Sequence, residues 1–380
     1  MHIVFLTNEY PTLHKNHGGI GRFVQTIALK LIQKNVEVSV LGLYPLEKDK
    51  FVEENGIKIY GLKQSDWPFA KFFNNRNRLL HTLTEIGLIN PIDLVEGFEA
   101  SFAFFPRNTK YKKIIRLHGG HHFFAHTLGK KTTFWKSYQE KLSFSKADAI
   151  IAVSNFVGNR TKELIHFKQP YTTLYNPVNL ENFNIFDRVV PIPHTLLFVG
   201  TVTEKKGIRE LIEAFLKVQK KIPDIILNIL GRDSKDQEGN SFIETLKKLI
   251  PEQNSHQIQF HGSIPGYDLP KWLAQSELCI YPSHSESFGL TVIEALAMEK
   301  PIIVSDIAVF KEIVDTSEAR FCSVQNSDDL AKQIEWMLLN PEIAIQMGKK
   351  GRYRVLKQYH IDKLIQENLD FYTSVQNSIN

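Results

Sequence analysis

The alternation of apolar and polar residues predicts strand–helix–strand units from the start of the chain. The apolar run 3–7 is short, rich in branched side chains and closed by the sequence NEYP, which is typical of a buried strand. Apolar residues then recur every three or four positions, at Ile20, Phe23, Ile27 and Leu31. This stripe indicates an amphipathic helix, and residues 36–43 return to strand character. A doubly wound parallel sheet is therefore expected.

The pattern continues along the chain and restarts once. Further buried strands that end in polar or glycine-rich loops are predicted at 92–98, 112–120 and 148–154. A second strand–loop–helix start follows at 195–218, after a turn-rich stretch. We therefore expect an α/β protein with Rossmann-like domains at 1–180 and 194–355, facing each other across a cleft. A C-terminal helix, 356–380, is expected to pack back on the first domain.

Length and composition agree with this organisation. The chain has 380 residues, 43% hydrophobic and 23% charged, which is ordinary for a folded two-domain protein. Two cysteines exclude a disulfide scaffold and a cysteine-based zinc site. No stretch approaches the roughly 20 apolar residues of a membrane-spanning helix, and the first residues lack the basic start of a signal peptide. These features predict a cytoplasmic protein that is at most peripheral on the inner face of the membrane.

The net charge of +5 conceals a difference between the two halves. Residues 1–180 contain 24 Lys and Arg against 14 Asp and Glu, whereas residues 181–380 contain 22 against 27. The first half is therefore basic and the second mildly acidic. An anionic partner would be attracted to the first half.

The first candidate site is the glycine-rich loop that precedes the first helix. Ligands of doubly wound sheets bind at the carboxyl ends of strands, and glycines let a ligand approach the backbone closely. A dinucleotide fingerprint that begins at Gly19 would need a glycine at position 24, where the chain has Val24, so a nicotinamide site is not expected. A flexible connecting loop remains the alternative.

The most specific signal is HSESFGLTVIEALAMEKP, residues 284–301. Glu286 follows a predicted strand, and Glu294 projects from a helix predicted to begin near Leu290. The amides expected to be free at the positive end of this helix, where a phosphate can bind, are those of Gly289, Leu290 and Thr291. Two carboxylates that flank an anion site would suit the hydroxyls of a nucleotide sugar. Acidic residues that merely favour a helix start are the alternative.

Two more loops carry charged or polar candidates. The sequence GTVTEKKG, residues 200–207, places Lys205 and Lys206 before a helix, where a lysine could neutralise a diphosphate or simply be solvated. The sequence RLHGGHH, residues 116–122, contains three histidines but no HExxH spacing or cysteine partner, so a metal site is not expected. His118 could instead hydrogen-bond a substrate or be structural.

Together these motifs resemble glycosyltransferase family 4, the retaining nucleotide-sugar glycosyltransferases of the GT-B fold. The resemblance covers nearly the whole chain and is strongest at residues 195–315. Its matching features are the N-terminal glycine loop, RLHG, AVSNF, NPVNLENF, FVG with KKG, and PSHSESFGLTVIEALAMEKPIIVSD.

The resemblance implies roles for individual residues. Glu286, Lys206 and His118 would be catalytic: Glu286 would contact hydroxyls of the donor sugar, Lys206 would neutralise the leaving diphosphate, and His118 would hydrogen-bond the sugar. The remaining donor-binding residues would be Gly19, Phe288, Gly289, Leu290, Thr291, Glu294 for the ribose, Ile264 beside the base, and Lys205. UDP is the expected nucleotide, and no cofactor is expected.

The chain departs from the family pattern in two places. The family usually has an arginine directly after the glycine of the 200–207 loop, where this chain has Thr201, so Lys205, Arg209 or Arg232 would have to supply the missing charge. The family also favours a glycine before the proline that follows the helix, where this chain has Glu299-Lys300. The first departure bears on rate and donor affinity, and the second on a turn.

The expected reaction is metal-independent, since no aspartate pair resembles a metal-binding DxD motif in a suitable loop. The acceptor would be a glycan or a lipid-linked hydroxyl in surface polysaccharide or glycolipid synthesis. Basic and aromatic residues interleave at 67–83, 110–113 and 130–136, a pattern that could meet an anionic lipid surface or be an ordinary solvated face. No nucleic-acid motif is present. A sugar-nucleotide epimerase and a catalytically impaired nucleotide-sugar-binding protein are the alternatives.

Overall fold

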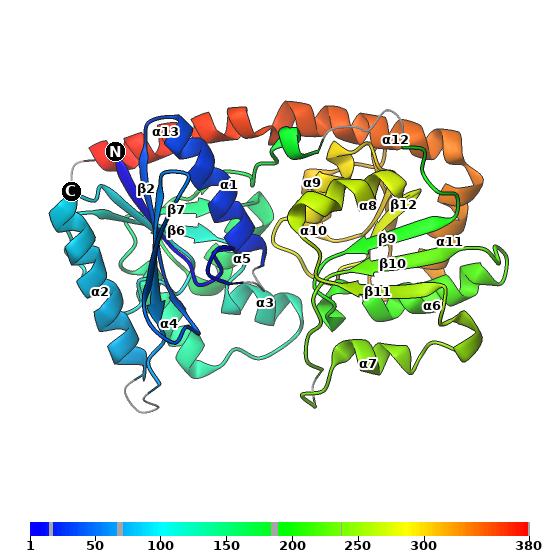
Figure 1. Ribbon diagram of the computed structural model, residues 1–380, viewed down its shortest axis with the longest axis horizontal. Coiled ribbons are helices and arrows are strands. Elements are labelled where there is room, and N and C mark those ends of the chain that lie inside the picture. Colours follow the sequence, from blue (N-terminus) through cyan, green and yellow to red (C-terminus); the bar gives the residue numbers. More distant parts are fainter. Residues whose placement is uncertain (15–17, 67–70, 184–188, 237, 379–380) are drawn as a thin grey trace. The chain divides into compact units, whose positions relative to one another are not determined.

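The computed structural model describes residues 1–14, 18–66, 71–183, 189–236 and 238–378. Three residues of the predicted features, His17 of the glycine loop and Trp67 and Phe69 of the aromatic segment, lie outside this described part. The chain divides into two compact units (Figure 1). The first unit contains Met1–Pro177 and Asp362–Asn380, and the second contains Val178–Ile361.

The first unit is built on a mixed sheet in which one edge strand is antiparallel. The described strands have the order β3-β4-β2-β1-β5-β6-β7-β8, and the β3–β4 pair is the antiparallel one. Their bounds are β1 His2–Leu6, β2 Glu37–Tyr44, β3 Lys50–Glu54, β4 Ile57–Lys63, β5 Leu94–Gly97, β6 Lys112–Leu117, β7 Ala149–Ala152 and β8 Thr172–Thr173. The β3–β4 hairpin was not expected from the sequence.

Helices cover both faces of this sheet. Their bounds are α1 Gly19–Gln33, α2 Lys71–Ile89, α3 His121–Thr127, α4 Phe134–Phe144, α5 Asn155–Ile165 and α13 Ile361–Asn377. Ile3 and Phe5 of β1 belong to a core that α1 and α13 complete, whereas Val4 belongs to the core formed with α2, α4 and α5. Successive side chains of a strand point to opposite faces, so a strand buried on both sides is a continuous apolar run.

The second unit has a six-stranded sheet, and all of its described strand pairs are parallel. Its order is β11-β10-β9-β12-β13-β14, with bounds β9 Thr195–Val199, β10 Ile226–Leu230, β11 Ile258–Gly262, β12 Leu278–Tyr281, β13 Ile302–Ser305 and β14 Arg320–Cys322. The helices are α6 Ile208–Gln219, α7 Phe242–Lys247, α8 Leu269–Gln275, α9 Leu290–Ala297, α10 Ala308–Ile313, α11 Ser327–Leu339 and α12 Pro341–Arg354. This strand order is that of a doubly wound nucleotide-binding sheet.

Both sheets reverse their strand order at one point, between β1 and β5 in the first unit and between β9 and β12 in the second. Ligands of such sheets bind outside the carboxyl ends of the strands at this switch point. The predicted α/β class with two doubly wound domains is confirmed. The loops after β1, β5, β9 and β12 are therefore the places to examine for a functional site.

Candidate functional site

Two loops meet at the switch point of the second sheet. The loop after β9 contains Gly200 and ends in a 3₁₀ turn at Glu204–Lys206, and the loop after β12 runs through Pro282 to Gly289. The backbone N–H of His284 donates to the Lys205 carbonyl oxygen over 2.8 Å, which ties the two loops together.

Gly207 makes this close approach possible. Its φ of +69° lies in the left-handed region that favours glycine, and a Cβ at this position would collide with the Pro282 carbonyl oxygen. His284 holds the same junction from the other side, because its Nε2 lies 3.1 Å from Glu210 Oε1 on α6. The contact between the two loops is therefore held by Gly207 and His284, independently of the side chains of Lys206 and Glu286.

Lys206 and Glu286 form an ion pair across this junction. The two residues are 80 positions apart in the sequence, and their side chains are 18% and 13% exposed. Ser283 Oγ also donates to Glu286 Oε1, over 3.1 Å. The two groups that sequence reasoning placed at the donor phosphate and the donor sugar are therefore in contact within the second unit.

Further positive charge surrounds this pair. Burial lowers the pKa of Lys205, and the Lys206 and Arg232 cations lower it further, while the Glu286 carboxylate opposes the shift. Arg232 follows directly after β10 and its glycine, and its carbonyl oxygen accepts from the Val202 N–H over 2.9 Å. Arg232 is thus anchored beside the loop that carries Lys205 and Lys206.

The N-terminus of α9 lies on the same loop as Glu286. Gly289 caps the helix with a φ of +98°, and no side chain of the described residues supplies a cap hydrogen bond there. The amides of Leu290 and Thr291 begin the helix, where intrahelical acceptors are missing. An anion would be stabilised at this end of α9 by the helix dipole as well as by hydrogen bonds.

Two predicted donor-binding side chains of this segment are buried. Phe288 is only 2% exposed and packs edge to face on Tyr359, with ring centroids 5.8 Å apart, so its side chain belongs to the core. Glu294 is 4% exposed on α9. Ile264 is half-buried in the loop after β11, at the sheet edge. The roles predicted for these three residues stay predictions.

His118 lies at the carboxyl end of β6 in the first unit. Its ring packs edge to face on Phe23 of α1, with centroids 5.3 Å apart. Burial, together with the neighbouring Arg116 cation, lowers the pKa of His118 to about 3. The imidazole is therefore neutral at physiological pH and can offer one hydrogen-bond donor and one acceptor. Gly19, the other candidate of this unit, is exposed as the first residue of α1.

Sequence reasoning missed a buried carboxyl group at the switch point of the first sheet. Glu99 follows β5 and is 4% exposed, and one of its oxygens has no hydrogen-bond partner among the described residues. Burial, with a further contribution from the Glu140 carboxylate, raises the pKa of Glu99 to about 8. A protonated carboxyl group at neutral pH can donate a hydrogen bond. Its position after β5 was the only available signal.

The other two histidines of the RLHGGHH segment have partners within the fold. His122 Nδ1 contacts the Glu140 carboxylate and its Nε2 lies 2.8 Å from Ser137 Oγ, while His121 Nε2 accepts from the Thr133 N–H over 2.9 Å. Glu140 also accepts from the His122 N–H and so caps α3. Across the part of the chain that is described, no group of three His, Cys, Asp or Glu side chains could hold a metal ion.

Comparison with known proteins gives this arrangement a family. The model of "Glycosyltransferase Family 4" matches residues 17–182, and that of "Glycosyl transferases group 1" matches residues 188–354. The chain is a family 4 glycosyltransferase.

Relatives and solved structures agree over nearly the full length. An uncharacterized glycosyltransferase of Haemophilus influenzae is 26% identical to this chain, and the alignment covers 92% of this chain and 95% of that protein. Sucrose-phosphate synthase from Thermosynechococcus elongatus has a TM-score of 0.86 at 19% identity, and each chain is covered to 99%. Anabaena HepE in complex with UDP and glucose has a TM-score of 0.79 at 14% identity, with 98% of this chain and 100% of that chain covered. These likenesses establish the GT-B fold.

The glycosyltransferase departs from its family pattern at Thr201, and the structure distinguishes the possible replacements for the missing arginine. Arg209 is bound to Glu204 through two hydrogen bonds of 3.0 Å and so already neutralises a carboxylate. Arg232, in contrast, acts electrostatically on Lys205. Arg232 is therefore close enough to act on Lys205, whereas Arg209 is paired with Glu204.

The second departure reaches further than the turn expected from the sequence. Glu299 adopts a φ of +56°, a conformation that glycine takes without strain. Lys300 is 6% exposed, and its ammonium donates to the carbonyl oxygens of Ala274 and Ser276 over 3.0 and 2.7 Å. In this glycosyltransferase the substituted pair therefore also satisfies the end of α8.

Proposed function

We propose that this glycosyltransferase moves a sugar from a nucleoside diphosphate donor, with UDP as the nucleotide, to a hydroxyl of a glycan or lipid-linked acceptor, with retention of anomeric configuration. The observation that carries the proposal is the contact of Lys206 with Glu286 beside the N-terminus of α9. A cation, a helix end and a sugar-binding carboxylate are thereby combined on two adjoining loops. The Anabaena protein with a similar fold has been solved with UDP and glucose.

Charge balance explains why several groups are required. A nucleoside diphosphate that leaves from a sugar carries at least two negative charges, and Lys206 is already partly balanced by Glu286. Lys205, Arg232 and the amides of α9 would supply the rest. Hydrogen-bond donors and cations that already point at the position where charge develops stabilise the transition state more than mobile solvent does, because they need no reorganisation during the reaction.

The proposed step proceeds on one face of the sugar. The bond between the anomeric carbon and the phosphate oxygen breaks, the acceptor oxygen bonds to the same face of that carbon, and the acceptor proton passes to the departing phosphate. Lys206 would stabilise the phosphate, Glu286 would hold hydroxyls of the donor sugar, and Glu294 would bind the ribose. Neutral His118 would hydrogen-bond the sugar, and the exposed backbone at Gly19 would allow close approach of the donor. Neither a metal ion nor a cofactor is part of the proposed step.

The test compares the unmodified protein with Lys206→Ala and Glu286→Ala on labelled UDP-, GDP- and ADP-sugars, with and without extracted glycolipid acceptors and with a chelator present. Transfer and donor hydrolysis should fall by about 100-fold or more in both variants. Lys217→Ala is the matched control, because Lys217 lies on α6 of the same unit, paired with Asp328 on the surface. Unchanged turnover in both variants would overturn the assignment of the site.

The same experiment separates the two alternatives. Conversion of the donor sugar to its epimer without an acceptor would identify an epimerase. Nucleotide-sugar binding without release of nucleotide, even with acceptors present, would identify a binding protein. The anomeric configuration of the product, measured by proton NMR coupling, tests retention separately.

A further inference from the structure

Six aromatic side chains of the first unit, Phe72, Phe73, Phe104, Phe134, Trp135 and Tyr138, form one continuous cluster, which we call the aromatic surface. They come from the start of α2, the β5–β6 connection and the start of α4. Phe72 lies 4.5 Å from Phe104 and 5.9 Å from Trp135, and Trp135 stacks on Phe104 at 5.8 Å between ring centroids. Figure 1 shows α2 and α4 in the same lower part of the first unit.

Much of this cluster is exposed instead of buried. The exposed fractions are 85% for Phe134, 56% for Phe73, 49% for Trp135 and 46% for Tyr138. Single exposed apolar residues are normal on proteins, but a contiguous group of large rings marks a surface with a partner. No helix among the described residues is long and apolar enough to cross a membrane, so these rings are not the end of a membrane span.

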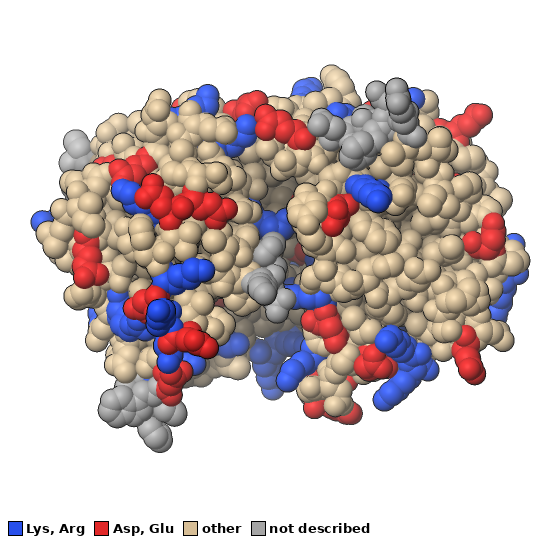
Figure 2. All heavy atoms as spheres, in the orientation of Figure 1, with Lys and Arg blue, Asp and Glu red and all other residues tan. Residues whose placement is uncertain are grey.

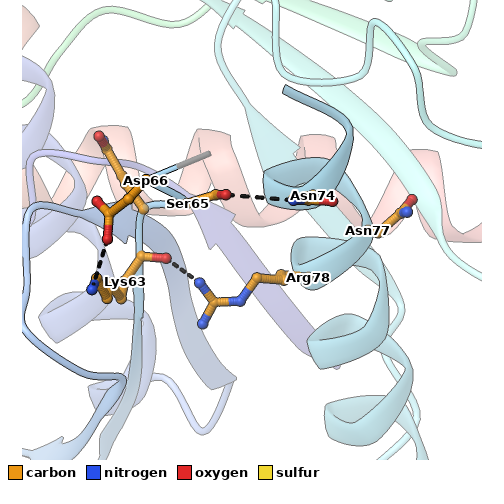
Figure 3. Close-up of a pocket in the computed structure, with 7 residues that line it drawn as sticks. Lys63, Ser65, Asp66, Asn74, Asn77 and Arg78 are labelled. Atoms are coloured by element: carbon orange, nitrogen blue, oxygen red, sulfur yellow. Dashed lines mark hydrogen bonds and ion pairs between the residues drawn. The ribbon is translucent and has the colours of Figure 1, made fainter. Parts of the chain in front are cut away.

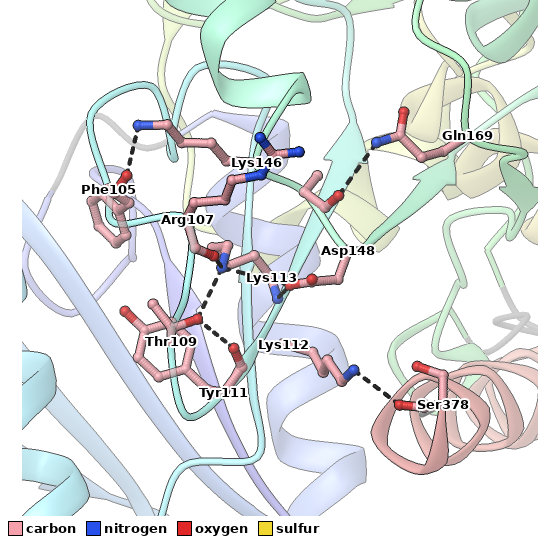
Figure 4. A network of polar contacts seen from close by, with 11 residues as sticks. Phe105, Arg107, Thr109, Tyr111, Lys112, Lys113, Lys146, Asp148, Gln169 and Ser378 are labelled. Carbon is pink, nitrogen blue, oxygen red and sulfur yellow. Dashed lines mark hydrogen bonds and ion pairs between the residues drawn. The ribbon is translucent and has the colours of Figure 1, made fainter. Parts of the chain in front are cut away.

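Hydrogen bonds fix the segments that carry the aromatic surface. Arg76 Nε donates to the Phe104 carbonyl oxygen over 2.7 Å and so joins α2 to the β5–β6 connection. Buried Lys113 donates to the Arg107 carbonyl oxygen and Lys146 to that of Phe105, over 2.9 and 2.6 Å (Figure 4). Buried Lys113 and half-buried Lys146 thus hold the connection that carries Phe104 in place. The rings therefore need little ordering when a partner binds.

The border of the aromatic surface is positively charged. Lys71, Lys130, Lys131 and Lys136 are all exposed within the segments that carry the rings. Segments 71–78, 104–113 and 128–141 together contain eleven Lys and Arg and one acidic residue, Glu140, which is buried against His122. Lys71, Lys130, Lys131 and Lys136 thus add positive charge to the border of the aromatic surface.

A nearby pocket of the same unit contains cations whose charge is neutralised by carboxylates. The pocket has a volume of about 400 Å³ and is lined by residues of β4 and α2 (Figure 3). Its two cations are paired, Lys63 with Asp66 at 2.8 Å and Arg78 with Asp49. This pocket therefore has little net attraction for an anion. Among the described residues, Lys71, Lys130, Lys131 and Lys136 at the border of the aromatic surface form no such ion pairs.

We propose that the aromatic surface docks the protein on a membrane that contains anionic lipid. Trp and Tyr rings favour the headgroup region because they combine an apolar body with a polar group, Phe rings can insert at the boundary with the acyl chains, and lysines at the border attract acidic headgroups by about 1 kcal/mol each. The inference rests on the proposed function in one respect only: the use of docking would be to bring the first unit to a lipid-linked acceptor. Binding itself needs neither nucleotide nor acceptor.

Flotation with vesicles of phosphatidylcholine and phosphatidylglycerol, or of phosphatidylcholine alone, tests the proposal on the full chain. The unmodified protein should float with the anionic vesicles only, and binding should fall when salt rises from about 0.1 to about 1 M, which shortens the screening length from about 10 to about 3 Å. The double variants Phe134→Ser/Trp135→Ser and Lys130→Gln/Lys131→Gln should each reduce partitioning by about tenfold or more.

Matched controls lie in the second unit. Tyr267→Ser removes a ring that is 83% exposed, and Lys349→Gln/Lys350→Gln removes an adjacent pair of exposed lysines. Both controls should float as the unmodified protein does. Donor hydrolysis should be unchanged in all of these variants, which separates loss of docking from loss of the catalytic site.

Three results would overturn the proposal. Absence of flotation with anionic vesicles would exclude membrane docking even if the protein transfers sugar. Equal binding losses in the aromatic-surface variants and their controls would exclude this location. Retention on an acidic glycan without vesicle binding would show that the surface binds the acceptor glycan and not a lipid surface.

Discussion

The switch point of the second sheet presents a charged pair, Lys206 with Glu286, whereas the carboxyl ends of β5 and β6 in the first sheet present groups from which burial removes the charge. Glu99 holds a proton at neutral pH because its pKa is raised to about 8, and nearby His118 lacks one because its pKa is lowered to about 3. The same architecture therefore supports two kinds of polar site. Charges suit a diphosphate, and neutral hydrogen-bonding groups suit sugar hydroxyls.

Net charge gives no indication of this difference. The second half of the chain is mildly acidic and yet gathers Lys205, Lys206 and Arg232 at one point, while the basic first half has exposed lysines at the border of the aromatic surface. Figure 2 shows acidic and basic side chains interspersed on the face of the molecule that it draws. What each loop can bind is determined by the arrangement of charged groups at the strand ends, and not by the sign of the net charge of that half of the chain.

The sharpest test of neutrality in the first unit is Glu99→Gln. Between pH about 4.5 and about 8 the folded state holds a proton on Glu99 that the unfolded state has lost, so this carboxyl group makes the protein less stable as pH rises through that window. Glutamine keeps the shape without the ionisation. At pH about 8 the variant should be more stable by on the order of 5 kcal/mol, measured by urea unfolding.

The control is Glu53→Gln, which removes an exposed carboxylate from β3 of the same unit. Its unfolding free energy should differ from that of the unmodified protein by less than about 0.5 kcal/mol at either end of the window. A Glu99→Gln protein with the unmodified dependence on pH would show that Glu99 is ionised in the folded state.

The next largest effect is expected for Gly120→Ala, which tests the packing that keeps these groups dry. A Cβ at Gly120 would collide with Glu140 Oε1 and lie 2.8 Å from Glu99 Cγ. The free energy of unfolding should fall by about 1–3 kcal/mol. Gly266→Ala serves as the control because a Cβ there meets nothing within 4 Å, and it should leave stability nearly unchanged.

Arg232→Ala tests whether the charged site at the switch point of the second sheet depends on more than the Lys206–Glu286 pair. Loss of this cation should weaken binding of a UDP-sugar by about tenfold, measured by calorimetry, since one charged contact to an anion contributes about 1–3 kcal/mol. Arg209→Ala removes the same charge from α6, where it is bound to Glu204, and should change affinity less than about twofold. Equal losses in both variants would show a general charge effect in place of a local one.

The smallest expected change concerns the pH dependence of His118. Because its folded pKa is about 3, the imidazole stays neutral from pH 5 to 7 and cannot produce a step in kcat/KM there. His118→Asn should lower the rate and leave the shape of the pH profile unchanged. A step near pH 6.5 that disappears in the variant would show that His118 titrates normally and that burial does not neutralise it.

Periodicity was enough to predict the buried strands and the helices after them. The run 3–7 corresponds to β1, and Ser154 caps α5 by accepting from the Val157 N–H. These features depend on neighbours in the sequence. The hairpin of β3 and β4 was missed: β3 is mostly exposed and lacks an apolar run, whereas β4 alternates buried and half-buried positions and was overlooked despite its period.

Contacts between distant segments could not be predicted in this way. Nothing local indicates that His284 bonds to Lys205, or that Glu140 caps α3 and raises the pKa of Glu99. The loops that carry Glu286 and Lys206 were found because both motifs lie at strand ends, but their contact follows from the strand order. The aromatic surface likewise exists only because three separate segments converge.

The C-terminal helix makes the core of the first unit depend on residues 362–380. Ile365, Tyr372 and Val375 belong to the core formed with β1 and α1, and buried Arg116 is bound to Asn368 and Tyr372 over 2.6 and 3.0 Å. The second unit, Val178–Ile361, is therefore an insertion within the first. During synthesis the ribosome releases everything the second unit needs before it releases the last helix of the first. The unit that begins the chain is thus the last to complete its core.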